Sequence, residues 1–182
     1  MQVISGRYRA RKLKSPDSAR PTLQRIKIST FSLIQDYIKP NIEVLDLFAG
    51  SGALGIECIS RGAKFVQFVE KDKSAIACIR QNLAGIDYDL YDVMNIDYLV
   101  ALKAFRENKV QFDVIFIDPP YDSGYYAPAV DIIERYNLLK DDGIIVLEMN
   151  KSKPIELNTK NLSIYKERDY GITKIMVLKR SD

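Results

Sequence analysis

The sequence predicts an α/β fold: a seven-stranded, mostly parallel sheet with helices on both faces and an antiparallel hairpin at its C-terminal end. From residue 42 onward, short apolar runs of strand length alternate with segments whose apolar residues recur at helical spacing. Such alternation is typical of parallel sheets, because right-handed crossovers place the connecting helices on the faces of the sheet. The last two apolar runs are joined by a tight turn instead, which indicates an antiparallel pair.

Strands and helices are expected to alternate between residues 42 and 149. The expected strands are 42–48, 65–70, 88–94, 112–118 and 143–149. The expected helices are 52–62, 72–85, 97–108 and 126–137. Asp72 is a suitable N-cap for the second of these helices, and Gly85 is a suitable stop at its end. The run 88–94 is the most polar of the strands.

Both ends of the chain depart from this alternation. Residues 162–169 and 172–180 flank Tyr170-Gly171 and predict the antiparallel hairpin at the edge of the sheet. Residues 1–15 alternate enough to form a small basic β-hairpin. A helix from about Thr22 to Ile38 is expected to lead from there into the first strand of the sheet.

Composition excludes several classes of protein. The 182 residues are 47% hydrophobic and 28% charged, the balance of an ordinary globular domain. No apolar run approaches the roughly 20 residues of a membrane helix, and the basic N-terminus has no apolar core of a secretory signal. We therefore expect a cytoplasmic protein, with Cys58 and Cys78 as buried free thiols. Histidine is absent, which removes the commonest general base and metal ligand, so no metal site is expected.

Positive charge is concentrated near the N-terminus. Residues 1–39 carry nine Lys and Arg against two Asp, a net of +7, whereas the rest of the chain has 18 basic and 22 acidic residues, a net of −4. A basic segment on an acidic body favours binding to a polyanion, and Tyr8 among the arginines favours a nucleic acid. A solvated basic face is the alternative. The residues expected to contact the nucleic acid are Arg7, Arg9, Arg11, Lys12, Lys14 and Arg20.

A glycine-rich loop between the first predicted strand and helix indicates a nucleotide site. Residues 50–55, GSGALG, match the pattern G-x-G-x-x-G. Glu70, at the end of the second strand, is placed to bind ribose hydroxyls. This pattern suits either a nicotinamide cofactor or S-adenosylmethionine. Asp46 favours the latter, because a carboxylate beside the loop attracts a ligand that carries an ammonium and a sulfonium. A glycine-rich turn without a ligand is the structural alternative.

Asp97 follows the third predicted strand and has two interpretations. It can accept a hydrogen bond from an adenine amino group, or it can cap the next helix, and both roles are compatible. Asp92, within the same polar strand, competes with Asp97 for the adenine.

The motif Asp118-Pro119-Pro120-Tyr121 ends a buried strand with an acid, two prolines and an aromatic residue. A rigid turn explains the prolines but neither the acid nor the tyrosine. Asp118 and the Pro119 carbonyl can each accept one N–H of an exocyclic base amine and orient its lone pair toward an electrophile. Tyr121 can stack on the base. The motif therefore predicts a site that methylates an amine, with S-adenosylmethionine as the methyl donor.

The order and spacing of LDLFAGSGALG, Glu70 and FIDPPY resemble class I S-adenosylmethionine-dependent methyltransferases with a Rossmann-like fold. With ISGRYRARKLKSP and RPTLQRIKISTF, nearly the whole chain resembles the RsmD-like family, bacterial guanine-N2 methyltransferases of 16S ribosomal RNA. One departure is that Gln24 precedes Arg25-Ile26, where the family usually has an acidic residue.

The resemblance implies roles for individual residues. It implies that the loop at the methionine end of the cofactor is formed by Asp46, Phe48, Ala49, Gly50, Ser51 and Gly52. Glu70 would bind the ribose, Asp97 would lie near the adenine, and Arg20 to Thr22 would form the cofactor entrance. It implies catalysis by Asp118, Pro119, Pro120 and Tyr121.

The resemblance also implies the organisation and partners of the chain. Residues 1–21 would form an RNA-binding arm and residues 22–182 the methyltransferase domain. The partner would be ribosomal RNA, in the small subunit or an assembly intermediate, and a monomer is the default expectation. Two other hypotheses are a DNA adenine or cytosine amino-methyltransferase and a non-catalytic RNA-binding assembly factor.

Overall fold

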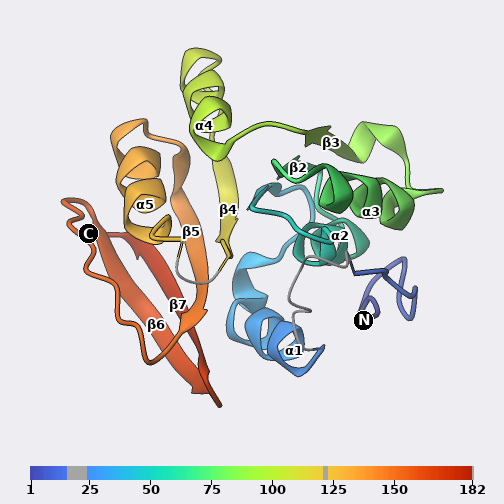
Figure 1. Ribbon diagram of the computed structural model, residues 1–182, viewed down its shortest axis with the longest axis horizontal. Helices are drawn as coiled ribbons and strands as arrows, with labels where there is room; N and C mark the ends of the chain where they lie inside the picture. Colours follow the sequence, from blue (N-terminus) through green and yellow to red (C-terminus); the bar gives the residue numbers. More distant parts are fainter. Residues whose placement is uncertain (16–23, 121–122, 182) are drawn as a thin grey trace.

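The structure is a computed structural model that describes residues 1–15, 24–120 and 123–181. Within these residues the strands form one seven-stranded sheet in the order β3-β2-β1-β4-β5-β7-β6 (Figure 1). The strands are β1 (Glu43–Leu47), β2 (Phe65–Val69), β3 (Tyr91–Met94), β4 (Phe112–Ile117), β5 (Leu139–Asn150), β6 (Leu162–Tyr170) and β7 (Thr173–Arg180). β1 to β5 pair in parallel, and β7 is antiparallel to both β5 and β6. The predicted fold class is confirmed.

Helices cover both faces of this sheet. They are α1 (Gln24–Leu33), α2 (Ala53–Ser60), α3 (Lys73–Leu83), α4 (Tyr98–Glu107) and α5 (Tyr126–Arg135), with short 3-10 turns at Gln35–Tyr37 and Tyr88–Leu90. No helix in the described part of the chain is long and apolar enough to cross a membrane. The two helical layers give the sheet a separate hydrophobic core on each face.

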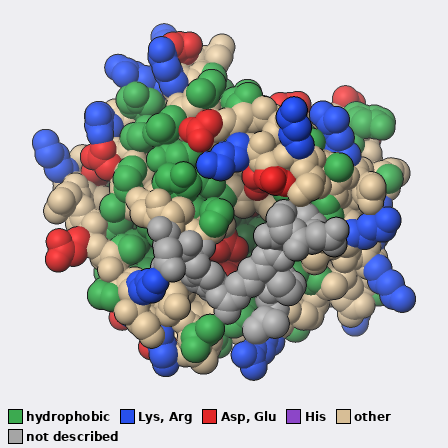
Figure 2. Space-filling model, in the orientation of Figure 1, with side chains coloured by type: hydrophobic (Ala, Val, Ile, Leu, Met, Phe, Trp, Pro, Cys, Tyr) green, Lys and Arg blue, Asp and Glu red, His purple; other side chains and the backbone are tan. Residues whose placement is uncertain are grey.

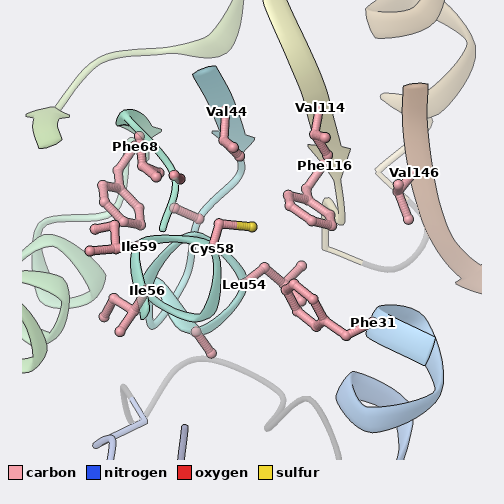
Figure 3. Packing of buried hydrophobic residues seen from close by; sticks show 14 of the residues in the cluster. Phe31, Val44, Leu54, Ile56, Cys58, Ile59, Phe68, Val114, Phe116 and Val146 are labelled. Atoms are coloured by element: carbon pink, nitrogen blue, oxygen red, sulfur yellow. The ribbon is translucent and has the colours of Figure 1, made fainter. Parts of the chain in front are cut away.

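Alternating strand residues supply these two cores. Val44 and Phe116 face the helices α1, α2 and α3, whereas their neighbours Leu45 and Ile117 face α4 and α5. Figure 3 shows α2 at the centre of the first core, with Cys58 buried among side chains from β1, β2 and β4. Strands buried on both faces read as continuous apolar runs, which is why the parallel strands were predictable.

Three element boundaries differ from those expected from the sequence. The described helix α1 ends at Leu33 rather than Ile38, and its Thr30 hydroxyl donates to the Ile26 carbonyl, a local bond that competes with helical continuation. Residues 88–90 form a 3-10 turn capped by Asp87 and are not part of β3. Strand β5 begins at Leu139 rather than at residue 143, because its pairing with β4 shifts in register between Phe112 and Val114. The polar residues before the apolar run bulge out at this shift.

The N-terminal segment, defined here as residues 1–15, folds back on itself and docks onto α2. One antiparallel bridge, Gln2–Lys12, closes it, so the expected hairpin is present in a shortened form. Gly6 has a φ of +84°, and a Cβ there would lie 1.8 Å from the Ser60 carbonyl oxygen. The Arg7 N–H donates to that same carbonyl over 2.7 Å. Glycine is therefore required where the segment meets the end of α2.

Candidate active site

The candidate site lies at the carboxyl ends of β1 and β4, where the strand order reverses. The two strands are neighbours, with Asp46 opposite Phe116 and Leu47 opposite Ile117. Asp118 directly follows β4, so both acids lie at the same edge of the sheet. Ligands of doubly wound sheets bind at such a switch point. Figure 2 shows acidic side chains among basic and hydrophobic ones on the face of the molecule that is seen in Figure 1.

The loop after β1 has an unusual backbone conformation. Phe48, Gly50 and Gly52 all have positive φ, at 68°, 55° and 74°. The N–H groups of Phe48 and Ala49 both donate to the Val69 carbonyl, at 3.1 and 3.0 Å, which holds the loop against the end of β2. A left-handed conformation at a phenylalanine is strained and is typical of a functional loop.

The two outer glycines of the pattern have different environments. Among the described residues, a Cβ on Gly50 would meet no atom within 4 Å, so this part of the chain leaves open space at the loop. A Cβ on Gly55 would lie 2.3 Å from the Phe68 ring, so Gly55 is needed for packing α2 against β2. The open side at Gly50 fits a ligand that approaches the backbone closely.

Glu70 holds the glycine loop from the end of β2. Its Oε2 accepts the Gly50 N–H over 2.9 Å, and its Oε1 accepts the Asp72 N–H over 2.9 Å. Each carboxylate oxygen retains a further acceptor position. Glu70 can therefore hold the loop and accept hydrogen bonds from ligand hydroxyls at the same time.

Asp46 is buried and carries an unusual pKa. Its Oδ2 accepts the Gly55 N–H over 2.9 Å, so it caps the first turn of α2, whose own N-cap Gly52 has no side chain. The pKa of Asp46 is raised to about 7, chiefly by burial; the hydrogen bond from Gly55 lowers it, and the charges of Asp118 and Glu70 contribute to the rise. Three carboxylates thus converge at this edge, which favours a cationic ligand.

The structure separates the two aspartates of the third strand. Asp97 lies beyond the carboxyl end of β3 and accepts the Leu99 N–H over 2.9 Å, so its predicted role as a helix cap is confirmed. Asp92 lies within β3, where its Oδ2 accepts from the Gln67 side chain over 2.9 Å. Asp97 is therefore the one at the edge where a ligand binds, and its contact with adenine stays a prediction.

An aromatic cluster that sequence reasoning missed borders the glycine loop. The rings of Phe48 and Tyr125 are stacked, with centroids 5.8 Å apart and an interplanar angle of 4°. Tyr98 lies against both rings, at 5.0 and 5.2 Å. The Lys71 ammonium lies 5.3 Å from the Tyr125 centroid, so the cluster joins the end of β2 to the start of α5. Tyr125 could have been found from its position just after the Asp118 motif.

The other predicted site residues are distributed as follows. Pro119 is buried and Pro120 exposed. Arg20, Thr22 and Tyr121 lie outside the described residues. In the N-terminal segment, Arg7, Arg9, Lys12 and Lys14 are exposed, whereas Arg11 donates to the Ala84 carbonyl. The guanidinium groups of Arg7 and Arg11 lie 5.5 and 5.8 Å from the Tyr8 ring centroid.

The residues at the switch point fit S-adenosylmethionine. The open space at Gly50 admits a ligand, Glu70 offers acceptors for hydroxyls, and the buried Asp46 carboxylate is electrostatically suited to a cation. A pyrophosphate would meet three carboxylates here and would be repelled.

The sheet order, the antiparallel β6–β7 pair and the loops after β1 and β2 define the Rossmann-like class I methyltransferase fold. The family model described as "Conserved hypothetical protein 95" matches residues 1–179. The chain belongs to this family, and the expected resemblance to RsmD-like proteins is confirmed.

Three relatives illustrate the match. "Ribosomal RNA small subunit methyltransferase D" of Haemophilus influenzae is 36% identical over 176 residues, which cover 94% of this chain and 90% of the relative. The structure of a hypothetical protein of Thermus thermophilus, TTHA0928, has a TM-score of 0.84 and 26% identity, covering 98% and 99% of the two chains. The crystal structure of SMU.776 complexed with SAH, at a TM-score of 0.67, shares the fold alone, with 16% identity over 81% of this chain and 48% of that one.

Proposed function

We propose that this protein transfers a methyl group from S-adenosylmethionine to the N2 amine of a guanine in 16S ribosomal RNA. The observation that carries the proposal is the convergence of Asp46, Glu70 and Asp118 at the switch point beside an open glycine loop. The carboxylates at the ends of β1 and β2 suit a cationic cofactor. The neighbouring strand β4 leads into the Asp-Pro-Pro-Tyr motif, which suits an amine.

The cofactor is held from the β1 and β2 side. Asp46 attracts the positive end of the ligand, the backbone at Gly50 lets it approach closely, and Glu70 accepts from the ribose hydroxyls. Asp97 accepts from the adenine amino group while it caps α4. When bound, S-adenosylmethionine supplies an electrophilic methyl group.

The amine of the base is held from the β4 side. The Asp118 carboxylate accepts one N–H and the Pro119 carbonyl accepts the other, which turns the nitrogen lone pair toward the methyl group. As the new N–C bond forms, the bond between the methyl group and the cofactor sulfur would break and S-adenosylhomocysteine would leave. Asp118 stabilises the positive charge that develops on the nitrogen and is placed to accept the proton that the amine then loses. The prolines keep both acceptors fixed, so little reorganisation is needed during the transfer. Tyr121 stacks on the base, which must first leave its helix.

The RNA is held by the exposed basic residues of the N-terminal segment. Arg7, Arg9, Lys12 and Lys14 are exposed, so their charged groups are accessible to phosphates. Residues 1–21 would be the RNA-binding arm and residues 22–182 the methyltransferase domain. The similarity to the Haemophilus influenzae small-subunit methyltransferase supports small-subunit ribosomal RNA as the substrate class. The choice of guanine N2 rests on the family resemblance of the motifs.

A methyl-transfer assay tests the proposal. Radiolabelled S-adenosylmethionine is offered with small ribosomal subunits, deproteinised 16S RNA or plasmid DNA, and the nucleosides of the labelled product are separated. We expect label in N2-methylguanosine from ribosomal RNA. Label in a DNA base would assign a DNA amino-methyltransferase instead, and no transfer to any substrate would leave an RNA-binding assembly factor.

A further inference from the structure

Asn82 of α3 joins the N-terminal segment to the glycine loop through a single side chain. The residue is 3% exposed. Its Nδ2 donates to the carbonyl oxygens of Ser51 and Lys14, both over 2.9 Å. Its Oδ1 accepts the Lys14 N–H over 2.8 Å. Nδ2 also lies 3.6 Å from the Cys78 sulfur as a longer third contact, so the amide bonds Ser51 and Lys14 through its nitrogen and Lys14 through its oxygen.

The Lys14 contact fixes a backbone position. Asn82 bonds both the N–H and the C=O of Lys14, as a neighbouring β-strand would. The Cys78 thiol also lies 3.3 Å from the Lys14 carbonyl oxygen. The side chain of Lys14 is exposed and takes no part in this clamp, so its ammonium is available for a phosphate.

The Ser51 contact fixes the cofactor loop. Ser51 lies between Gly50 and Gly52, which both have positive φ, so the direction of its carbonyl depends on the conformation of both glycines. A ligand that holds this loop in one conformation also holds the acceptor of Asn82. Because one amide group bonds both residues, a rotation that changes its hydrogen bond to Ser51 also changes its hydrogen bonds to Lys14.

We propose that Asn82 is a positioning residue that couples cofactor binding to RNA binding. Cofactor in the glycine loop orders Ser51 and, through Asn82, holds Lys14 and the basic segment in the conformation that binds RNA. Bound RNA favours the cofactor-binding conformation by the same route, because such coupling is reciprocal. This inference rests on the proposed function, which supplies both ligands.

The coupling is measured with S-adenosylhomocysteine and deproteinised 16S RNA as probes, at one fixed salt concentration. The affinity for RNA is measured with and without saturating S-adenosylhomocysteine, and the affinity for S-adenosylhomocysteine with and without RNA. In the wild-type protein we expect each ligand to tighten the other by the same factor, about fivefold or more. In Asn82→Ala we expect this factor to fall close to one, while each ligand still binds alone.

Ser60→Ala is the matched control. The Ser60 hydroxyl accepts the Tyr8 N–H over 2.9 Å and donates to the Ser5 carbonyl, so it anchors the same segment without touching the glycine loop. We expect Ser60→Ala to weaken RNA binding but to keep the coupling factor. If Ser60→Ala loses as much coupling as Asn82→Ala, the coupling depends on how the N-terminal segment as a whole is docked. That result would overturn the proposed role of Asn82.

Two further results keep the proposal falsifiable. A wild-type coupling factor of one overturns it, even if both ligands bind. If Asn82→Ala does not fold, Asn82→Asp replaces it, because aspartate keeps the acceptor for Lys14 but loses both donors; an unchanged factor there overturns the proposal. Absence of binding by both probes to the wild-type protein would instead refute the proposed function on which the inference rests.

Discussion

The Lys27 ammonium lies 3.1 Å from the Glu57 carboxylate, and both side chains are fully buried between α1 and α2. Burial lowers the pKa of Lys27, and the neighbouring Glu57 opposes this shift. The Glu57 carboxylate also accepts the N–H groups of Ile4 and Ser5, at 2.8 and 3.0 Å. One acid therefore joins α1, α2 and the N-terminal segment.

Removing Glu57 should destabilise the protein more than removing Lys27. Glu57→Ala leaves a buried ammonium without its counter-ion and two backbone N–H groups without their acceptor, which we expect to cost roughly 3–5 kcal/mol of unfolding free energy. In Lys27→Met, Glu57 keeps its ion pair with Arg61, at 2.9 Å, and its hydrogen bonds from both backbone N–H groups. The loss of unfolding free energy in this variant should therefore be smaller. Urea denaturation of both variants measures this order. A larger loss in Lys27→Met would contradict it.

Asp46 should make the folded state less stable as the pH rises from about 4 to about 7. Its pKa of about 7 when folded exceeds the ordinary value of 3.8, so the folded state binds the proton more tightly in this range. Stability falls with pH wherever the folded state holds more protons than the unfolded state. The substitution Asp46→Asn removes the ionisable group but keeps a side-chain oxygen for the Gly55 N–H.

We therefore expect Asp46→Asn to gain stability relative to the wild type between about pH 5 and about pH 8, by at most about 3 kcal/mol. Denaturation at both pH values measures this difference. A difference that is the same at both would show that Asp46 does not titrate as described.

Gly50→Ala should weaken cofactor binding, with Gly85→Ala as its control. Both glycines have positive φ, 55° and 77°, and a Cβ at either would meet no atom of the residues that the structure describes within 4 Å. Both substitutions should therefore cost a similar amount of stability, about 1 kcal/mol. Only Gly50 lies in the proposed cofactor loop, so only Gly50→Ala should lower S-adenosylhomocysteine affinity, by about tenfold or more. Calorimetric titration that finds equal affinities in the two variants would place the cofactor elsewhere.

Asp118→Ala should abolish methyl transfer while it largely spares cofactor binding. We expect the transfer rate to fall by about 100-fold or more, because a fixed acceptor for the amine is lost. Asp118 raises the pKa of Asp46, so affinity should be compared at about pH 8, where Asp46 is mostly ionised in both proteins. Lost affinity for S-adenosylhomocysteine would assign Asp118 to the cofactor site instead.

Arg9→Gln and Arg11→Gln should differ in their effects on RNA binding. Arg9 is exposed, whereas Arg11 donates to the Ala84 carbonyl at the end of α3. Arg9→Gln should reduce the slope of log affinity against log salt by about 0.7–0.9, the loss of one phosphate contact. Arg11→Gln should lower stability as well as affinity. Salt titrations of both variants test this, with the exposed Lys103→Gln of α4 as a control expected to change nothing.

Local patterns explain what could be predicted from the sequence. The strands, the glycine loop, Glu70 and the Asp118 motif follow from residue type and spacing within short stretches. Lys27, Glu57 and Asn82 could not be found in this way. Charged residues on a helix are usually exposed, and nothing near Lys27 in the chain indicates that its partner is 30 residues away. Asn82 bonds Ser51 and Lys14, which are 31 and 68 positions away in the sequence and come close to it only in the folded chain.

The docking of the N-terminal segment depends mainly on main-chain groups, and it leaves the side chains of Arg9, Lys12 and Lys14 exposed. Ile4, Ser5, Arg7, Tyr8 and Lys14 are all held through their backbone N–H groups. Gly6 is the position where a side chain would collide. The exposed basic residues could therefore be exchanged, by evolution or by design, to suit a different RNA without rebuilding the enzyme beneath them.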